Sequence, residues 1–192
     1  MTKTENFEQV EITTAIQLRE WLLKNHTQKE SIWLVTYKKQ VPEKYVSVQE
    51  ILDELLCFGW IDGIRRKLDL DRTMQLIAPR KVEHWAQTYK DRFAKLEKLG
   101  LVHQAGTNSV LASKQNGLWN FMDDVDALIK PEDLIKCLNE HPPAMECFET
   151  FSKSNKRFIL RWIKLAKTPA TRQKRILETA TLAQKNLKIL GL

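Results

Sequence analysis

The stretch of residues 47–68 constrains the fold most, because its hydrophobic period changes at a single glycine. Ser47 and Glu50 form a capping box, and the apolar residues after them recur at helical spacing. Gly59 is placed to end this helix, since glycine accepts the left-handed backbone that a helix end needs. From Ile61 onward the period is two, which predicts that the chain passes directly from an amphipathic helix into a strand.

The strand after Gly59 has a predicted partner, so we expect a β-hairpin. Its first strand begins at Ile61, residues 69–72 form the turn, and residues 73–78 form the second strand, which Pro79 closes. Strict alternation would place four residues on one face of the first strand: Asp62, Ile64, Arg66 and Leu68.

The other segments add one further strand and a series of helices. Residues 31–39, SIWLVTYKK, are β-branched and aromatic, which favours a strand. A helix capped by Thr14 precedes that strand, and only helical patterns follow Pro79. This order predicts an α+β protein in which helices pack a small antiparallel sheet with a β-hairpin, because a doubly wound parallel sheet would need more strands.

An acidic segment around residues 123–126 is the predicted boundary between two parts. Residues 1–122 form an α+β body that contains the hairpin. Residues 127–192 form an all-helical module, in which Pro131 and Pro143 suit the first turns of two short helices.

The charge of the chain is concentrated at its C-terminal end. The whole chain has a net charge of +7. Residues 152–192 contain eleven cations and one acid, a net charge of +10, whereas the preceding 151 residues contain 20 cations and 23 acids, a net charge of −3. The sequence therefore predicts a mildly acidic body and a basic C-terminal module.

Cations of this module recur at helical spacing, which is typical of a surface that binds nucleic acid or another polyanion. A solvated helix face is the other interpretation. The partner is then either nucleic acid or an acidic protein, and the sequence does not decide the oligomeric state. The candidate polyanion-binding residues are Arg157, Arg161, Arg172, Lys174 and Arg175.

A second cluster of charges lies in the hairpin, where a carboxylate could hold an arginine fork for a bidentate contact with an anion. Three interpretations are open: solvated surface charges, a buried ion network that fixes the hairpin, and a site for an anion or a partner. The candidate residues are Trp60, Asp62, Arg65, Arg66, Lys67, Arg72 and Arg80.

Sequence signatures of catalysis and metal binding are mostly absent. The chain has no GxSxG elbow, no GxxxxGKS/T phosphate loop and no GxGxxG. Cys137 and His141 have helical spacing, but with Cys147 they fall short of the four ligands of a structural zinc. We therefore predict no catalytic residue, no metal and no cofactor, and we expect all three cysteines to be reduced.

Nothing in the sequence predicts export or insertion into a membrane. The first residues, MTKTENFEQVEITT, contain no apolar core with a small-residue cleavage site. No run of about 20 apolar residues follows. We therefore expect a protein without a membrane span that is located in the cytoplasm.

Two long segments resemble a known family. The first is FGWIDGIRRKLDLDRTMQLIAPRK, with its GWID motif, basic stretch and Pro-Arg pair, and the second is PPAMECFETFSKSNKRFILRWIKLAKTPATRQKRI, with its Trp-Ile and Thr-Arg-x-x-Arg elements. Both resemble the YdeI/OmpD-associated family of bacterial proteins. The resemblance extends from about Trp21 onward.

The resemblance implies a role in bacterial stress tolerance, including protection from bacteriocins and cationic antimicrobial peptides. Some members of the family are described as periplasmic. It implies no catalytic residues, so we expect a non-enzymatic protein that acts by binding a partner. Two alternatives stay open: a polyanion-binding protein that uses the C-terminal helices, and an enzyme with a pocket at Trp60, Asp62, Arg66 and Arg80.

Overall fold

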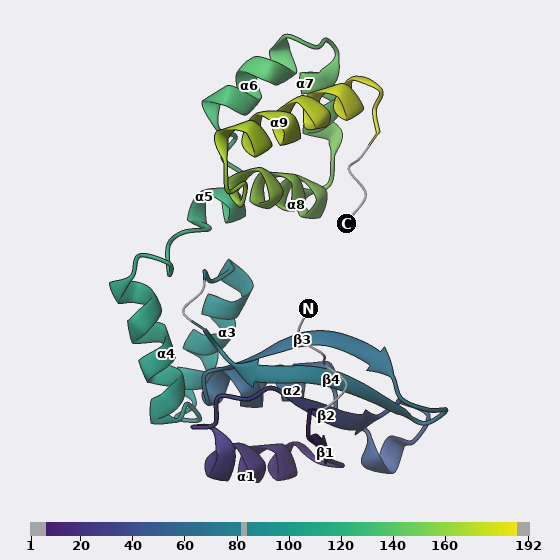
Figure 1. The fold of residues 1–192 in the computed structure, drawn as a ribbon, viewed down its shortest axis with the longest axis vertical. Helices are drawn as coiled ribbons and strands as arrows, with labels where there is room; N and C mark the ends of the chain where they lie inside the picture. The colour runs from purple at the N-terminus through teal and green to yellow at the C-terminus, as the bar shows by residue number, and fades with distance from the viewer. Residues whose placement is uncertain (1–6, 82–83, 188–192) are drawn as a thin grey trace. The chain divides into compact units, whose positions relative to one another are not determined.

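A computed structural model describes residues 7–81 and 84–187 of the chain. It divides into two compact units, Met1–Asn120 and Phe121–Leu192 (Figure 1). The described part of the first unit contains a sheet and helices, and that of the second contains helices alone. The predicted α+β class is therefore confirmed.

The sheet has four strands in the order β1-β2-β4-β3. Strand β4 is antiparallel to both of its neighbours, whereas β1 pairs with β2 in parallel, so the sheet is mixed. The sequence did not predict β1, because three residues are too few to show an alternation. The strands are β1 (Gln9–Glu11), β2 (Ile32–Tyr37), β3 (Trp60–Lys67) and β4 (Arg72–Pro79).

The predicted hairpin is present as β3 and β4, but the alternation along β3 is not strict. Asp62 lies opposite Ile77 and Arg65 lies opposite Gln75, so one extra residue bulges out of β3 between these two pairs. Opposite residues of an antiparallel pair share a face. The bulge therefore places Asp62 and Arg65 on one face and moves Arg66 to the other, so the prediction that Asp62 and Arg66 share a face is wrong.

Side-chain caps define the helices on either side of β2. Thr14 caps α1 (Ala15–Asn25) by accepting a hydrogen bond from the Gln17 N–H at 3.2 Å. Ser47 caps α2 (Val48–Cys57), and the predicted capping box with Glu50 is complete in both directions. A short 3-10 helix, η2 (Pro42–Lys44), lies between β2 and α2.

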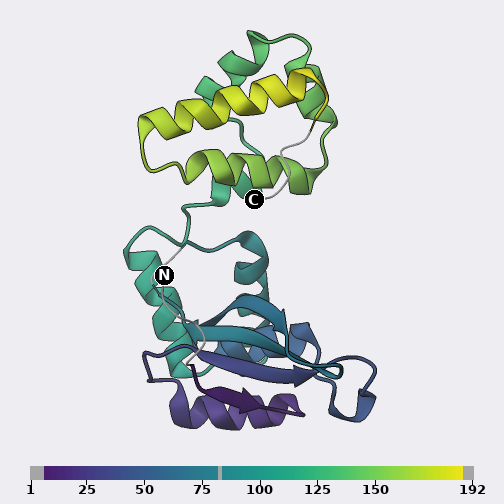
Figure 2. The ribbon, with the colours of Figure 1, turned by 45° about the vertical axis from the view of Figure 1, so that its right-hand side comes forward.

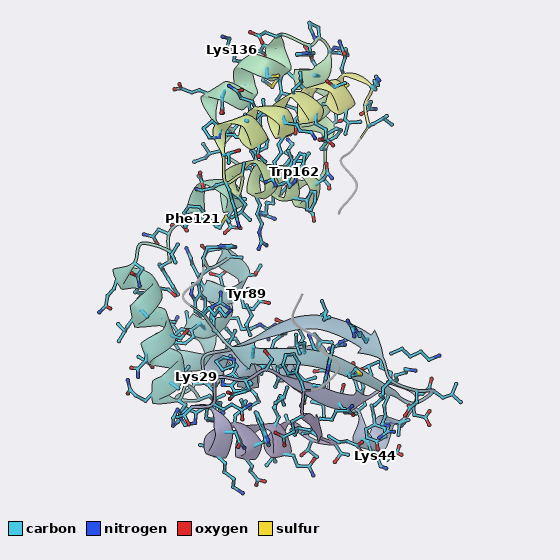
Figure 3. The ribbon with its side chains drawn as sticks, in the orientation of Figure 1. Lys29, Lys44, Tyr89, Phe121, Lys136 and Trp162 are labelled. Carbon is cyan, nitrogen blue, oxygen red and sulfur yellow. The ribbon has the colours of Figure 1, made fainter. Side chains whose placement is uncertain are left out.

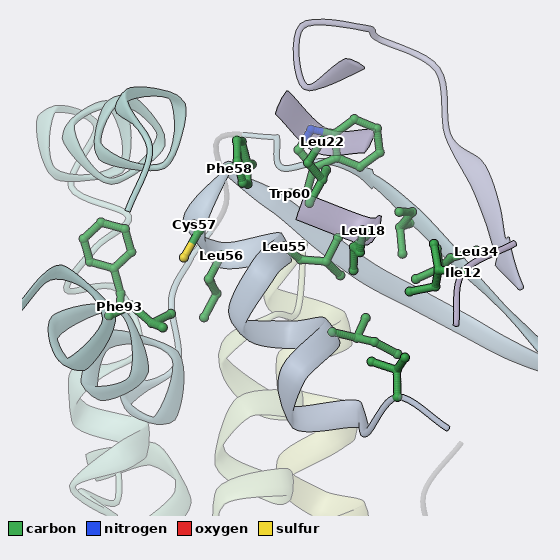
Figure 4. Packing of buried hydrophobic residues seen from close by; sticks show 14 of the residues in the cluster. Ile12, Leu18, Leu22, Leu34, Leu55, Leu56, Cys57, Phe58, Trp60 and Phe93 are labelled. Carbon is green, nitrogen blue, oxygen red and sulfur yellow. The ribbon is translucent and has the colours of Figure 1, made fainter. Parts of the chain in front are cut away.

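The core of the first unit lies on the sheet face that carries Trp60. Figure 4 shows Leu18 and Leu22 of α1 beside Leu55 of α2 and the Trp60 ring, and all four residues are buried. The Cys57 sulfur, at the end of α2, points toward the helix that carries Phe93. Two helices complete this unit: α3 (Gln87–Lys98) and α4 (Gln104–Gln115).

The end of α2 and the start of α4 approach each other closely. The His103 N–H donates to the Cys57 carbonyl at 3.0 Å. Gly59 has φ +70°, as the sequence predicted for the residue that ends α2, and Gly106 lies against the carbonyls of Leu56 and Cys57. The predicted helix at residues 109–115 begins earlier than expected, because the His103 side chain caps it.

In the described part of the second unit, two short helices and two longer ones follow α5 (Asp123–Asp126). Helices α8 and α9 run side by side (Figure 2). The acidic segment that the sequence suggested as a linker is α5, and its Val125 is buried in the core of this unit. The remaining helices are α6 (Glu132–Asn139), α7 (Ala144–Thr150), α8 (Lys153–Lys164) and α9 (Pro169–Gln184).

No helix in the described ranges combines the length and the apolar character that crossing a bilayer requires.

Candidate functional site

The hairpin cations that the sequence grouped as one candidate site lie in separate surroundings. Arg66 packs on the Trp33 ring at 5.2 Å. Arg80 lies over the Trp85 ring at 4.0 Å. Lys67 is exposed on β3. Arg66 and Arg80 therefore pack on different aromatic rings and Lys67 is exposed, so the hairpin does not gather its positive charges at one point.

Trp60 belongs to the core. It is 1% exposed, and its ring forms a T-shaped pair with the Trp21 ring at 5.4 Å between ring centroids. Its Nε1–H donates to the His26 carbonyl at 3.2 Å. Because Arg66 lies on the opposite sheet face, this arrangement does not support an enzyme pocket built from Trp60, Asp62, Arg66 and Arg80 together.

Asp62 lies in a hydrogen-bond network that connects the hairpin to α3. Its Oδ1 accepts from the Tyr89 hydroxyl at 3.1 Å, and its Oδ2 accepts from Gln75 Nε2 at 3.0 Å. Arg65 Nη2 in turn donates to Gln75 Oε1 at 2.5 Å. Burial raises the pKa of Tyr89, and the nearby Asp62 carboxylate raises it further. Figure 3 labels Tyr89, the residue through which α3 joins this network.

Arg72 forms a second network, at the tip of the hairpin. Its Nε donates to Asp69 Oδ2 at 2.8 Å, and its Nη1 donates to Glu11 Oε2 at 2.6 Å. Hydrogen bonding from Arg72 lowers the pKa of Asp69. The Tyr37 hydroxyl and Arg72 both lower the pKa of Glu11. Arg72 therefore joins the hairpin tip to the edge strand β1. Binding of an anion by the hairpin stays a prediction.

A cavity of the first unit lies elsewhere, between α2 and α3. Its volume is about 650 Å³, and its lining also includes Ala15 at the start of α1 and two leucines after α3, Leu99 and Leu101. The sequence did not predict this cavity. In the sequence the lining appears only as the polar faces of two helices. Such faces are typical of solvated surfaces, and only the packing of the two helices forms the cavity.

Two ion pairs lie at this cavity. Arg92 Nη1 donates to Asp53 Oδ1 at 2.6 Å, and Arg19 Nη1 donates to Glu54 Oε2 at 2.9 Å. Burial raises the pKa of Glu54 despite the opposing effect of Arg19. Burial also raises the pKa of the Cys57 thiol to about 11, so this cysteine is a neutral part of the cavity lining.

Several cations of the helical unit are paired with acids of the same unit. Arg172 makes a bidentate contact with Asp133, which lowers the pKa of that carboxylate. Lys164 pairs with Asp124 of α5 at 2.5 Å.

The net charges of the two units are similar. The residues from Phe121 onward contain 13 cations and nine acids, a net charge of +4, and the first unit has 18 cations and 15 acids, a net charge of +3. The two units therefore differ much less in charge than residues 1–151 and 152–192 do, and the prediction of a mildly acidic body is wrong because the first unit is positive.

The candidate polyanion residues have different surroundings. Arg175 lies over the Trp162 ring, which Figure 3 labels, and donates to the Trp162 carbonyl. Arg157 Nε is 3.5 Å from the Asp126 carbonyl oxygen, and both Arg157 and Arg161 are exposed. Lys174 is also exposed. Polyanion binding by these residues, together with the paired Arg172, stays a prediction.

Within the described ranges, no three His, Cys, Asp or Glu side chains are arranged to hold a metal. Cys137 Sγ and His141 Nδ1 are 3.9 Å apart, and the same Nδ1 is 2.8 Å from the Cys137 carbonyl. All three cysteines are free thiols.

A pair of histidines lies where α1 and α4 meet. The rings of His26 and His103 are 4.7 Å apart, and His103 stacks on Phe58 at 4.9 Å. The His103 Nδ1 accepts a hydrogen bond from the Ala105 N–H, which caps α4. Burial lowers the pKa of His103, and His26 and Arg19 add repulsion. The neutral imidazole therefore stabilises this junction.

We expect the first unit to lose stability in mild acid. Because the folded-state pKa of His103 is below its ordinary value of 6.5, the unfolded chain binds the proton more tightly. The stabilisation by neutral His103 is complete above pH 6.5. It is lost as the pH falls from 6.5 toward the folded-state pKa of His103. Denaturant unfolding at pH 7.5 and 5.5 measures the loss.

His103→Asn is the matched variant for this effect, since an asparagine oxygen can cap α4 without titrating in this range. The stability difference between the two pH values should be smaller in His103→Asn than in the unchanged protein. An equal difference in both proteins would assign the pH dependence to other groups.

Comparisons with known families match both parts of the chain. The model of a domain of unknown function (DUF8412) matches residues 10–109, more than half of the chain. The model described as Bacteriocin-protection, YdeI or OmpD-Associated matches residues 127–186. The comparison with curated proteins and that with solved structures gave no match.

The second match confirms the family that the sequence motifs suggested, over a narrower range. The GWID motif, residues 59–62, lies within the range of the first model. The chain therefore belongs to the family of the DUF8412 domain, and its C-terminal unit carries a domain of the Bacteriocin-protection, YdeI or OmpD-Associated family.

Proposed function

We propose that this protein contributes to the tolerance of bacteriocins or other antimicrobial peptides in bacteria, and that it acts by binding a partner. The observation that carries the proposal is the match of residues 127–186 to a family whose description includes bacteriocin protection. These residues lie within the helical unit, which has a hydrophobic core of its own.

The charge of the protein favours an acidic partner over a cationic peptide. Both units have a net positive charge, so the electrostatic field of the protein repels a cationic peptide and attracts an acidic surface. The exposed cations of the helical unit that make no ion pair with described residues supply the contact. They include Lys153, Arg157, Lys167 and Lys174.

Deletion of the gene from a bacterial strain that carries it should lower survival under challenge with polymyxin or with a bacteriocin. A plasmid copy of the unchanged gene should restore survival, because the protein itself provides the tolerance. Survival that is the same with and without the gene would contradict the proposed function.

A charge variant tests the mode of action separately. Changing Lys153, Arg157, Lys167 and Lys174 together to glutamine should prevent the plasmid copy from restoring survival, although the protein accumulates to the same level. The matched control removes four exposed cations from the first unit and should restore survival fully: Lys24, Lys29, Lys81 and Lys98. Full restoration by the first variant would contradict an acidic partner at these cations and leave the tolerance role standing.

A further inference from the structure

We infer that the cavity between α2 and α3 binds a small amphipathic cation, that is, a molecule with one ammonium group on an apolar body. The cavity has a volume of about 650 Å³, which is within the usual range for small-molecule sites. It lies outside residues 127–186, so binding there is independent of the proposed role in peptide tolerance.

The apolar part of the lining fits the body of such a ligand. Leu96 is 4% exposed and forms part of the core, and the neutral Cys57 thiol is also part of the lining. Leu99 and Leu101 are 60% and 41% exposed, which is high for leucine side chains that line a cavity. A ligand with an aromatic or aliphatic body would bury this surface.

The charged part of the lining favours a cation. Four carboxylates and two cations line the cavity, a net charge of −2 in a protein whose overall charge is +7. Arg19 is paired with Glu54 and reduces this local excess to −1. The lining carboxylates are Glu50, Asp53, Glu54 and Asp91.

Three of these carboxylates retain an oxygen that can accept a hydrogen bond. Asp53, Glu54 and Asp91 each use one oxygen in a contact with the protein, to Arg92, Arg19 and Gln87. The other oxygen of each makes no hydrogen bond with a described residue. Burial raises the pKa of Glu54 even though Arg19 is paired with it, so its negative charge is incompletely compensated. An ammonium group would compensate it through a charge-assisted hydrogen bond.

Three probes share a phenyl group and differ in charge, so they separate the effect of ligand charge on binding from that of ligand shape. They are phenethylamine, 2-phenylethanol and 3-phenylpropionate. Titration of the full chain at pH 7.5, followed by NMR chemical shifts, should show that phenethylamine binds about tenfold more tightly than 2-phenylethanol, because its ammonium makes a charge-assisted contact. The acid should bind most weakly. Equal binding of the amine and the alcohol, tighter binding of the acid, or no binding of any probe would overturn the inference.

Two charge-removing variants locate the ammonium group. Glu54→Gln and Asp91→Asn should each weaken phenethylamine binding several-fold and leave 2-phenylethanol unaffected. Glu20→Gln removes the same charge from the exposed part of α1, outside the lining, and should change nothing. Circular dichroism melting verifies that each variant is folded. Unchanged amine binding in both cavity variants would place the cation elsewhere and overturn the inference.

A filling variant tests the cavity itself. Ala15 lines it and is only partly buried, so Ala15→Leu adds volume inside the cavity. Binding of both phenethylamine and 2-phenylethanol should fall together. If Ala15→Leu is folded and binds both probes as tightly as the unchanged protein, the probes bind at another surface and the inference is wrong.

Discussion

Trp60→Ala should lower the free energy of unfolding of the first unit by about 3–5 kcal/mol, the range for removing a large aromatic side chain from a core. Trp60 is 1% exposed and its ring forms a T-shaped pair with the Trp21 ring. The substitution leaves a cavity at the junction of α1 and β3, and it also leaves the His26 carbonyl without its 3.2 Å hydrogen bond. Urea unfolding followed by circular dichroism measures the loss.

Two further variants isolate the causes of this loss. Trp60→Phe retains much of the apolar volume but removes the N–H donor, so it should cost about 1–2 kcal/mol. Lys67→Ala, at the exposed end of the same strand, should stay within about 0.5 kcal/mol. If Trp60→Ala costs no more than Lys67→Ala, Trp60 is not a core residue.

Gly106→Ala should destabilise the first unit by about 2–3 kcal/mol, although alanine is ordinarily the better helix former by about 1 kcal/mol. A β-carbon at Gly106 would lie 2.4 Å from the Cys57 carbonyl oxygen and 2.8 Å from that of Leu56. Both are backbone atoms at the end of α2, so relief requires α2 and α4 to move apart. Thermal unfolding should show a melting temperature lower by about 10 °C.

Gly100→Ala is the control for this effect. Gly100 has φ +68°, and a β-carbon there would meet no atom within 4 Å. Only backbone strain opposes the substitution, so it should cost about 1 kcal/mol. A stability of Gly106→Ala equal to or above that of the unchanged protein would show that α2 and α4 are not in the close contact described.

The features predicted correctly from the sequence depend on a few neighbouring residues. The capping box at Ser47 and Glu50 closes within one helical turn, and the positive φ of Gly59 ends the same helix. Pro131 and Pro143 are the N-cap residues of two short helices, directly before the first turns in which the sequence placed them. Caps and turns of this kind form through local hydrogen bonds, so they can be recognised before any tertiary contact is known.

The failed predictions concern contacts between distant residues. The bulge between Asp62 and Arg65 is a property of the pairing with β4, and it reverses which faces Arg65 and Arg66 occupy. Strand β1 has only three residues and exists because β2 provides a parallel partner. Neither feature has a local pattern that would reveal it.

The candidate sites differ in the same way: one was predicted from neighbouring residues, and the other depends on contacts between distant residues. The hairpin cluster was found from charges close together in sequence, but packing distributes those charges among Trp33, Glu11 and Gln75. The cavity between α2 and α3 was missed because its two walls are about 40 residues apart in the chain, as Asp53 and Arg92 illustrate. Each wall alone has the composition of a solvated helix face.

By itself, the sequence determined most of the helices, the hairpin, the α+β class and the family of the C-terminal part, because these depend on local periodicity, caps and contiguous motifs. The tertiary structure alone decided the register of the hairpin, the site at which α2 and α4 touch, the pairing of Lys164 and Arg172 with Asp124 and Asp133, and the cavity. The physical reason is distance along the chain. Packing brings together side chains that are far apart in the sequence, and no local sequence pattern indicates that they are in contact.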